Sequence, residues 1–229
     1  MPKVLIDGDI VAYRAGFATE GLLPEDAEEK VDELLGYILD ATTFDGEPYQ
    51  IYLTGSGNFR YDIAFSYEYK GNRRGTAKPE HLDHIRDYLS DYYSAVTSAG
   101  EEADDLIAIE ATSLGPHTII ASVDKDFLQV PCVHYNTGKG IWTTQDEWNG
   151  LLFFYEQILT GDKADNIVGL KGIGPVKAKR ILDGAETERE LYERCLEAYD
   201  GNERRVIENG QLLWLRREVG QLWQPPEVN

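Results

Sequence analysis

The sequence predicts an α/β fold in which a parallel sheet flanked by helices precedes a helical C-terminal region. Three observations lead to this prediction. Short apolar segments alternate with segments of helical period up to about residue 145, which is the order that builds βαβ units. After that point helical periodicity dominates. The 229 residues are 42% hydrophobic, which is enough to bury a core.

The first half of the chain contains the segments expected to build the sheet. Apolar runs bounded by polar residues predict strands, and apolar residues three and four apart predict helices. Strands are expected at Lys3–Ile6, Tyr49–Leu53, Ala95–Thr97 and His117–Ser122, and helices at Glu25–Thr42, Pro79–Tyr93 and Glu101–Ser113. Gly55–Gly75 has no clean period, so we expect a long loop or a mobile helical segment there.

The second half begins with a predicted β-hairpin and continues with helices. The hairpin covers Val133–Trp142 and turns around Thr137–Gly140. Helices are expected at Thr144–Leu159, Pro175–Leu182 and Gly184–Tyr199, with a glycine-punctuated loop at Gly161–Gly174. The Pro-Pro pair near the end predicts a loose tail at Trp223–Asn229.

The charge pattern is acidic overall with two basic islands. The chain has 22 basic and 41 acidic residues, a net charge of −19, which argues against a general coat for nucleic acid. Residues 171–180 and Lys70–Lys78 each carry four basic residues and no acidic one. These islands are compatible with a local phosphate-binding track. No apolar run is long enough to span a membrane, no secretory signal is visible, and the two cysteines are expected to be reduced, so a cytoplasmic location is expected.

Acidic residues fall where a parallel sheet would gather them. Asp7 follows one predicted strand and Asp124 and Asp126 follow another, and ligands of open α/β sheets bind at the carboxyl ends of strands. Two further acidic groups are the helix start with Glu102, Asp104 and Asp105 and the loop with Asp162 and Asp165. Each group alone also fits a cap or a turn. Together they predict a site for Mg²⁺ or Mn²⁺, because hard cations make crowded carboxylates tolerable.

The two basic islands have features that suit phosphate. Gly172 and Gly174 precede a helix with Lys177 and Lys179, so backbone amides and lysines can meet a nucleic-acid backbone there. A plain glycine turn before an amphipathic helix is the alternative. Aromatic and basic side chains interleave between Phe59 and Arg74, a mixture that suits single strands but that a surface loop also shows.

These motifs, taken in order, resemble the flap endonuclease/5′→3′ exonuclease family. The motifs are Asp7, FR at 59–60, YKGNRR at 69–74, EADD at 102–105, SVDKDFLQV at 122–130 and TGDKADNIVGLKGIGPVKAKRIL at 160–182. This family includes the 5′-nuclease domain of bacterial DNA polymerase I and the phage exonucleases. The size, the predicted hairpin and RVIENGQLLWL near the end look most like the short exonucleases of the bacteriophage T7 type.

The resemblance implies a PIN-like catalytic domain at 1–160 with an arch at about 55–80, a helical region at 161–222 with a helix-hairpin-helix element, and the tail at 223–229. It implies hydrolysis of DNA by two metal ions, in phage DNA replication or host DNA degradation, by a monomer in the host cytoplasm. Nicks, flaps and 5′ ends are the implied substrates, and cleavage of RNA–DNA hybrids stays open.

The resemblance also implies roles for single residues. The first ion would be held by Asp7, Glu102, Asp104, Asp105 and Asp124, and the second by Asp126, Asp162 and Asp165. Asp7, Lys70 and Arg73 would be catalytic. Arg60, Tyr69, Arg74, Gly172, Gly174, Lys177 and Lys179 would bind DNA, with a K⁺ ion on the carbonyls of the glycine hairpin.

One position departs from the family, and three other functions stay open. The family usually has an aspartate at the end of the strand before FR, where this chain has Thr54 or Gly55. A DNA-binding protein with impaired catalysis is therefore one alternative. Ile6–Val11 also fits the DxDx(T/V) pattern of haloacid-dehalogenase-type phosphatases, in which Asp7 would be the nucleophile. A ribonuclease of the wider PIN group is the third, although simple members lack the glycine hairpin.

Overall fold

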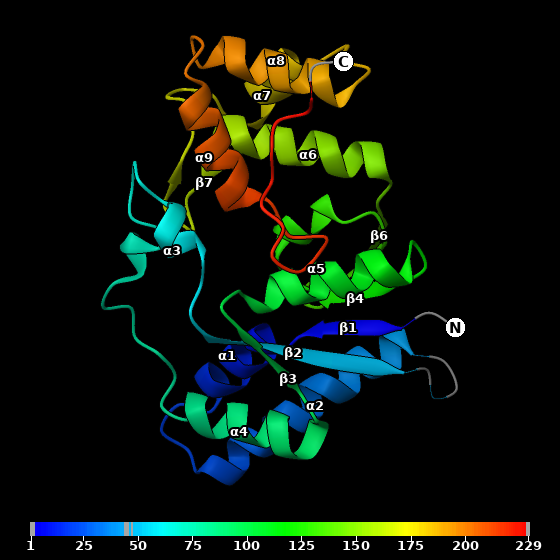
Figure 1. Cartoon of the computed structure of the whole chain (residues 1–229). Helices are drawn as coiled ribbons and strands as arrows, with labels where there is room; N and C mark the ends of the chain where they lie inside the picture. Colours follow the sequence, from blue (N-terminus) through cyan, green and yellow to red (C-terminus); the bar gives the residue numbers. More distant parts are fainter. Residues whose placement is uncertain (1–2, 44–45, 47, 228–229) are drawn as a thin grey trace.

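A computed structural model describes residues 3–43, 46 and 48–227 (Figure 1). Its strands form a six-stranded sheet in the order β3-β2-β1-β4-β5-β6. The first five run parallel, and the predicted hairpin adds β6 antiparallel to β5, so the sheet is mixed rather than wholly parallel. The strands are β1 (Val4–Asp7), β2 (Tyr49–Ser56), β3 (Val96–Ala99), β4 (Ile119–Ser122), β5 (Val133–Asn136) and β6 (Ile141–Thr144).

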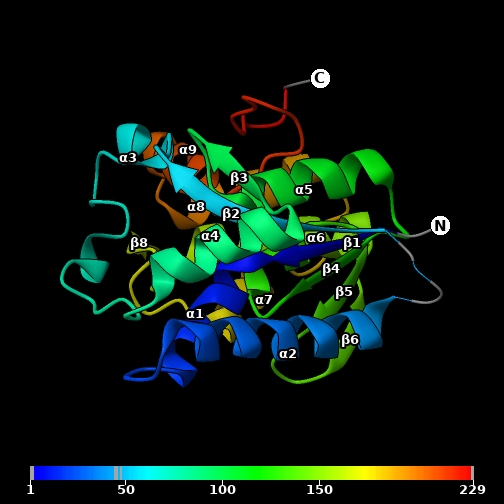
Figure 2. The same ribbon diagram turned by 90° about the horizontal axis from the view of Figure 1, so that it is seen from below.

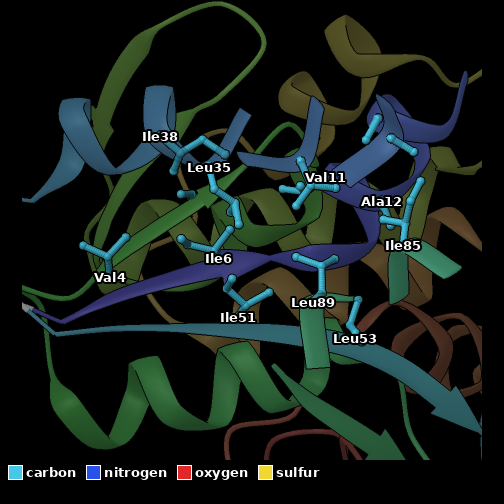
Figure 3. Close-up of a cluster of buried hydrophobic side chains, with 14 of the residues drawn as sticks. Val4, Ile6, Val11, Ala12, Leu35, Ile38, Ile51, Leu53, Ile85 and Leu89 are labelled. Carbon is cyan, nitrogen blue, oxygen red and sulfur yellow. The ribbon is translucent and has the colours of Figure 1, made fainter. Parts of the chain in front are cut away.

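Helices cover both faces of the sheet (Figures 1 and 2). Val4 and Ile6 of β1 point to one face, where they meet α1 (Gly8–Ala18), α2 (Pro24–Thr42) and α4 (Leu82–Tyr93), as Figure 3 shows. Leu5 points to the opposite face and packs with α5 (Ala103–Leu114), because successive strand residues alternate between faces. This two-sided burial explains why the strands read as continuous apolar runs.

The C-terminal region has a separate core. Helices α6 (Glu147–Thr160), α7 (Pro175–Leu182), α8 (Glu188–Ala198) and α9 (Glu203–Leu213) pack around Phe154 and its neighbours. Two short strands, β7 (Gly161–Asp162) and β8 (Ile167–Val168), pair within the loop that was expected to be irregular. The prediction of a loose tail from residue 223 is wrong at its start, because the Trp223 ring is 5% exposed and packs against Phe154. Residues 228 and 229 lie outside the described range.

Two helices were not predicted from the sequence. The helix α1 follows β1 directly, and Asp7 caps it by accepting a hydrogen bond from the N–H of Ile10. A side chain at Gly8 would come within 2.6 Å of the carbonyl oxygen of Tyr52, so the close packing of α1 on β2 requires a residue that favours helix poorly. The other unpredicted helix is α9. None of the described helices is long and apolar enough to cross a membrane.

Candidate active site

Asp7 lies at the carboxyl edge of the sheet and is only 4% exposed. Ser122, which ends the neighbouring strand β4, donates its hydroxyl to Oδ2 of Asp7 at 2.7 Å. Burial raises the pKa of Asp7 to about 7; Ser122 opposes this, while the charges of Asp9 and Asp124 add to it. Such a raised pKa marks a place where negative charge is concentrated and poorly hydrated.

The N-terminus of α5 adds more negative charge at the same edge. Burial raises the pKa of Asp104 well above its usual range, and the charges of Asp7, Asp124 and Glu102 raise it further. The structure thus brings together carboxylates from the ends of β1 and β4 and from the start of α5, as the sequence predicted. Their role as metal ligands stays a prediction.

Lys125 forms ion pairs with two further carboxylates, those of Asp126 and Asp162. Its ammonium nitrogen lies 2.9 Å from Oδ1 of Asp126 and also donates to Oδ2 of Asp162. Gln157 of α6 donates to the same oxygen of Asp126 at 2.7 Å. Burial, with the charge of Asp124 nearby, raises the pKa of Asp126 to about 6. Burial also acts to raise the pKa of Asp162, but Lys125 and backbone donors hold it below its usual value.

The predicted arch lies against the loop that carries Asp165. It contains two short helical segments, α3 (Arg60–Ile63) and η1 (Gly71–Arg73). The ammonium group of Lys70 pairs with Oε1 of Glu102 and lies 3.7 Å from Oδ2 of Asp165. Arg73 contacts Oδ1 of Asp165 at 2.5 Å and stays half exposed. These two predicted catalytic residues therefore lie beside the acidic edge.

Tyr69 does not fit its predicted role as a stacking ring for DNA. Its side chain is 2% exposed and packs in the C-terminal core. Its hydroxyl lies 2.8 Å from Oε2 of Glu102 and 2.7 Å from Oδ2 of Asp165. The prediction is wrong because the ring is buried beneath the arch, and Tyr69 instead links the arch to two acidic residues.

Arg60 and Asp105 also differ from their predicted roles. Arg60, expected to bind DNA, is 2% exposed and binds both carboxylate oxygens of Asp105, at 2.6 and 2.9 Å. Asp105, expected to hold the first metal, is fully buried. One of its oxygens also accepts the N–H of Arg216 at 3.2 Å. Both predictions are corrected: the pair is an internal structural link, in which Arg60 also lies 3.7 Å from Oε2 of Glu102.

The remaining predicted DNA-binding residues lie on the solvent-exposed surface. Arg74 is 77% exposed in its side chain and pairs with Glu68. Gly172 has φ +79°, and a side chain added there or at Gly174 would meet open space. Lys177 donates to the carbonyl oxygen of Gly172 at 2.8 Å, so this ammonium group contacts one of the carbonyls expected to bind K⁺. Lys179 is exposed and lies 4.0 Å from Glu156.

The chain is similar in sequence to known DNA polymerases and to a flap endonuclease. No family model matches the chain. It is 34% identical over 203 residues to DNA polymerase I of Bacillus caldotenax, an alignment that covers 78% of this chain and 23% of the polymerase. It is also 29% identical over 184 residues to the flap endonuclease Xni of Shewanella piezotolerans, with 73% and 71% covered. This chain is a homologue of flap endonuclease Xni and of part of DNA polymerase I.

The fold of this chain is similar to that of a solved phage protein. It superposes on the T5 D15 protein co-crystallized with metal ions with a TM-score of 0.70 at 17% identity, covering 93% of this chain and 89% of that one. This likeness supports the PIN-like α/β fold. This chain spans only 23% and 18% of the length of two DNA polymerase I relatives, from Bacillus caldotenax and Rhizobium leguminosarum.

In this chain, Thr54 stands where the family aspartate was expected, and it forms a structural link. Its hydroxyl oxygen accepts the N–H of Ala103 at 3.0 Å, so it fixes the start of α5. Its own N–H donates to Oδ2 of Asp9 at 3.0 Å. Arg86 completes this group by contacting Oδ1 of Asp9 at 2.5 Å. Arg86 could not be predicted from the sequence, because no motif connects it to Asp9 and Thr54, which lie more than 30 positions away.

The clustered donors of this site fit hard divalent metal ions. All of its clustered donors are carboxylate oxygens, which these hard ions prefer. The pKa values of Asp7, Asp104 and Asp126 are raised by burial and by neighbouring charges. Within the described ranges, no group of three or more Asp, Glu, His or Cys side chains is arranged to hold one metal ion as the side chains stand. Lys70 and Lys125 supply the positive charge between the carboxylates here.

Proposed function

We propose that this chain is a structure-specific 5′→3′ exonuclease and flap endonuclease that hydrolyses DNA with two divalent metal ions. The main support is the gathering of Asp7, Asp104 and Asp124 at one sheet edge, where burial and mutual charge raise the pKa of Asp7 and of Asp104. A phosphatase would use Asp7 as a nucleophile, but that function gives no role to the arch that lies beside Glu102.

Two groups of carboxylates are the proposed metal ligands. Asp7, Glu102, Asp104 and Asp124 would hold the first ion, and Asp126, Asp162 and Asp165 would hold the second. Solved neighbours with similar folds include the T5 D15 flap endonuclease in a pseudo-enzyme-product complex with DNA and metal ions. When bound, such ions activate water and stabilise the leaving oxygen of a phosphodiester.

The chain's own cations have separate tasks in this proposal. Lys70 and Arg73 neutralise the negative charge that grows on the scissile phosphate. Arg74 and Lys179 are exposed and attract the DNA backbone. Gly172, Gly174 and Lys177 form the proposed helix-hairpin-helix contact, within a helical region at 161–222 that follows the catalytic domain at 1–160. A K⁺ ion there would need Lys177 to leave the carbonyl of Gly172.

The test is a digestion series with 5′-labelled nicked, flapped and gapped duplexes and an RNA–DNA hybrid. We expect cleavage in Mg²⁺ or Mn²⁺ and none in EDTA. Binding of branched DNA with no cleavage in either metal would instead favour the impaired protein suggested by Thr54. Phage replication, host DNA degradation, a monomeric state and a location in the host cytoplasm are further parts of the proposal. Gel filtration with light scattering checks the monomeric state.

A further inference from the structure

Glu208 of α9 is a buried carboxylate within the RVIENGQLLWL segment, and no role was predicted for it from the sequence. It is 2% exposed, and one of its oxygens, Oε1, accepts the N–H groups of Phe65 and Ser66 at 2.8 and 2.7 Å. The other oxygen, Oε2, accepts the hydroxyl of Ser66 at 2.5 Å. Both ribbon views show α3 and the segment after it beside α9 (Figures 1 and 2).

Two arginines on the same helix complete this contact. Arg205 pairs with Oε2 of Glu208, which compensates the buried negative charge. The guanidinium carbon of Arg204 lies 3.9 Å from the centre of the Phe65 ring, and that of Arg205 lies 5.2 Å from the centre of the Tyr67 ring. A cation over an aromatic face is attracted to it. These five side chains form what we call the arch clamp: Phe65, Ser66, Tyr67, Arg205 and Glu208, with Arg204 beside them.

The arch clamp lies close in sequence to the residues proposed to contact phosphate. Lys70 is four positions after Ser66, so the two Cα atoms are at most about 14 Å apart and a shift at Ser66 can move Lys70. Lys70 is held on its other side, where its N–H donates to the carbonyl oxygen of Asp165 at 2.8 Å. The side chain of Asn166 donates to the carbonyl of Glu68 at 2.8 Å. The segment 65–70 is therefore fixed at both ends.

We propose that Glu208 is a positioning residue that sets the arch so that Lys70 and Arg73 face the acidic edge. This inference rests on the proposed nuclease function for its kinetic consequence, but not for its structural one. Glu208 touches neither the acidic edge nor the exposed basic residues in the contacts described above. Its effect on catalysis would act through its hydrogen bonds to Phe65 and Ser66.

The test compares Glu208→Ala with Glu208→Gln and a charge-matched control. The glutamine keeps an Oε1 oxygen that can accept both N–H groups, whereas alanine keeps none. Glu197→Ala on α8 is the control, because Glu197 is exposed and its replacement changes the net charge equally. For Glu208→Ala we expect kcat to fall about tenfold, because Lys70 and Arg73 would no longer be held in position beside the scissile phosphate. KM and duplex affinity should change less than about threefold. Glu208→Gln should recover most of the rate.

A second measurement follows the arch without any DNA. Chymotrypsin cleavage after Phe65 and Tyr67 should be several times faster in Glu208→Ala than in the wild type or the control, because local opening exposes the backbone. Ser66→Ala removes only the hydrogen bond from the Ser66 hydroxyl to Glu208 and changes no residue of α9. Because Ser66 is exposed, this variant should fold even if Glu208→Ala does not, and its rate of proteolysis should be intermediate. Unchanged proteolysis in both variants overturns the inference. If the wild type cleaves no DNA, the proteolysis still decides the role of Glu208 separately from the nuclease function.

Discussion

The guanidinium group of Arg60 binds both carboxylate oxygens of Asp105, at 2.6 and 2.9 Å, inside the protein. Arg60 also donates to the carbonyl oxygens of Leu212 and Trp214, both at 2.9 Å. The pair therefore links the start of the arch and the start of α5 to the last turn of α9 and the residue after it. The guanidinium pKa of Arg60 is raised because Asp105 outweighs the opposing effect of burial.

Replacing Arg60 with alanine should destabilise the fold strongly. The change leaves Asp105 buried without its partner, which costs about 3–5 kcal/mol in free energy of unfolding. Urea unfolding measures this loss, and Arg74→Ala is the control, because the Arg74 side chain is 77% exposed and should cost less than about 1 kcal/mol. A stable Arg60→Ala protein with weakened DNA binding would restore the original prediction that Arg60 contacts DNA.

Lys70 and Lys179 should separate turnover from DNA binding. Lys70 lies beside Glu102 at the acidic edge, so Lys70→Ala should lower kcat by about a hundredfold or more while duplex affinity changes little. Lys179 is exposed on α7, so Lys179→Ala should weaken duplex binding and reduce its salt dependence while kcat stays near the wild-type value. Single-turnover kinetics and binding isotherms at two salt concentrations check both. Equal kcat for wild type and Lys70→Ala removes Lys70 from the proposed mechanism.

Replacing Lys125 with methionine should strengthen divalent ion binding. The ammonium group of Lys125 occupies oxygens of Asp126 and Asp162, both proposed ligands of the second ion, so an ion must displace it. Removing this positive charge should tighten the weaker of two Mn²⁺ sites about tenfold, since neighbouring like charges repel. Calorimetry or electron paramagnetic resonance measures the affinity without DNA. Lys139→Met is the charge-matched control, and equal affinities in both variants would contradict the prediction.

The stability of the metal-free protein should fall as Asp7 ionises. Burial raises the folded-state pKa of Asp7 from 3.8 to about 7, so the folded state binds the extra proton and stability decreases as the pH rises between these values. In EDTA, Asp7→Asn should therefore raise Tm by roughly 5 °C at pH 8 and change it little at pH 4. Asp87→Asn, at an exposed position of α4, should show no such difference. A Tm gain of equal size at both pH values would show that ionisation is not the cause.

Most helices and strands could be predicted from the sequence because their signals are local. The apolar period predicted α7 with the same limits that the structure has, and the hairpin of β5 and β6 to within two residues. It also placed Asp7 and Asp124 at strand ends, where the parallel arrangement brings them together. By contrast, α1 has buried residues on several sides and contains two glycines packed against other elements, so it shows little amphipathic pattern.

The order of strands, helices and acidic motifs along the chain determined the fold class and the acidic edge of the sheet, because periodicity and strand-end positions depend on neighbours in sequence. Tertiary structure alone decided which charged and aromatic side chains face solvent. Arg60 and Tyr69 lie in a polar, irregular segment, yet both are buried by partners up to 154 residues away. Desolvation and ion pairing depend on those distant partners, so the sequence pattern could not distinguish Arg60 from Arg74, or Asp105 from Asp104.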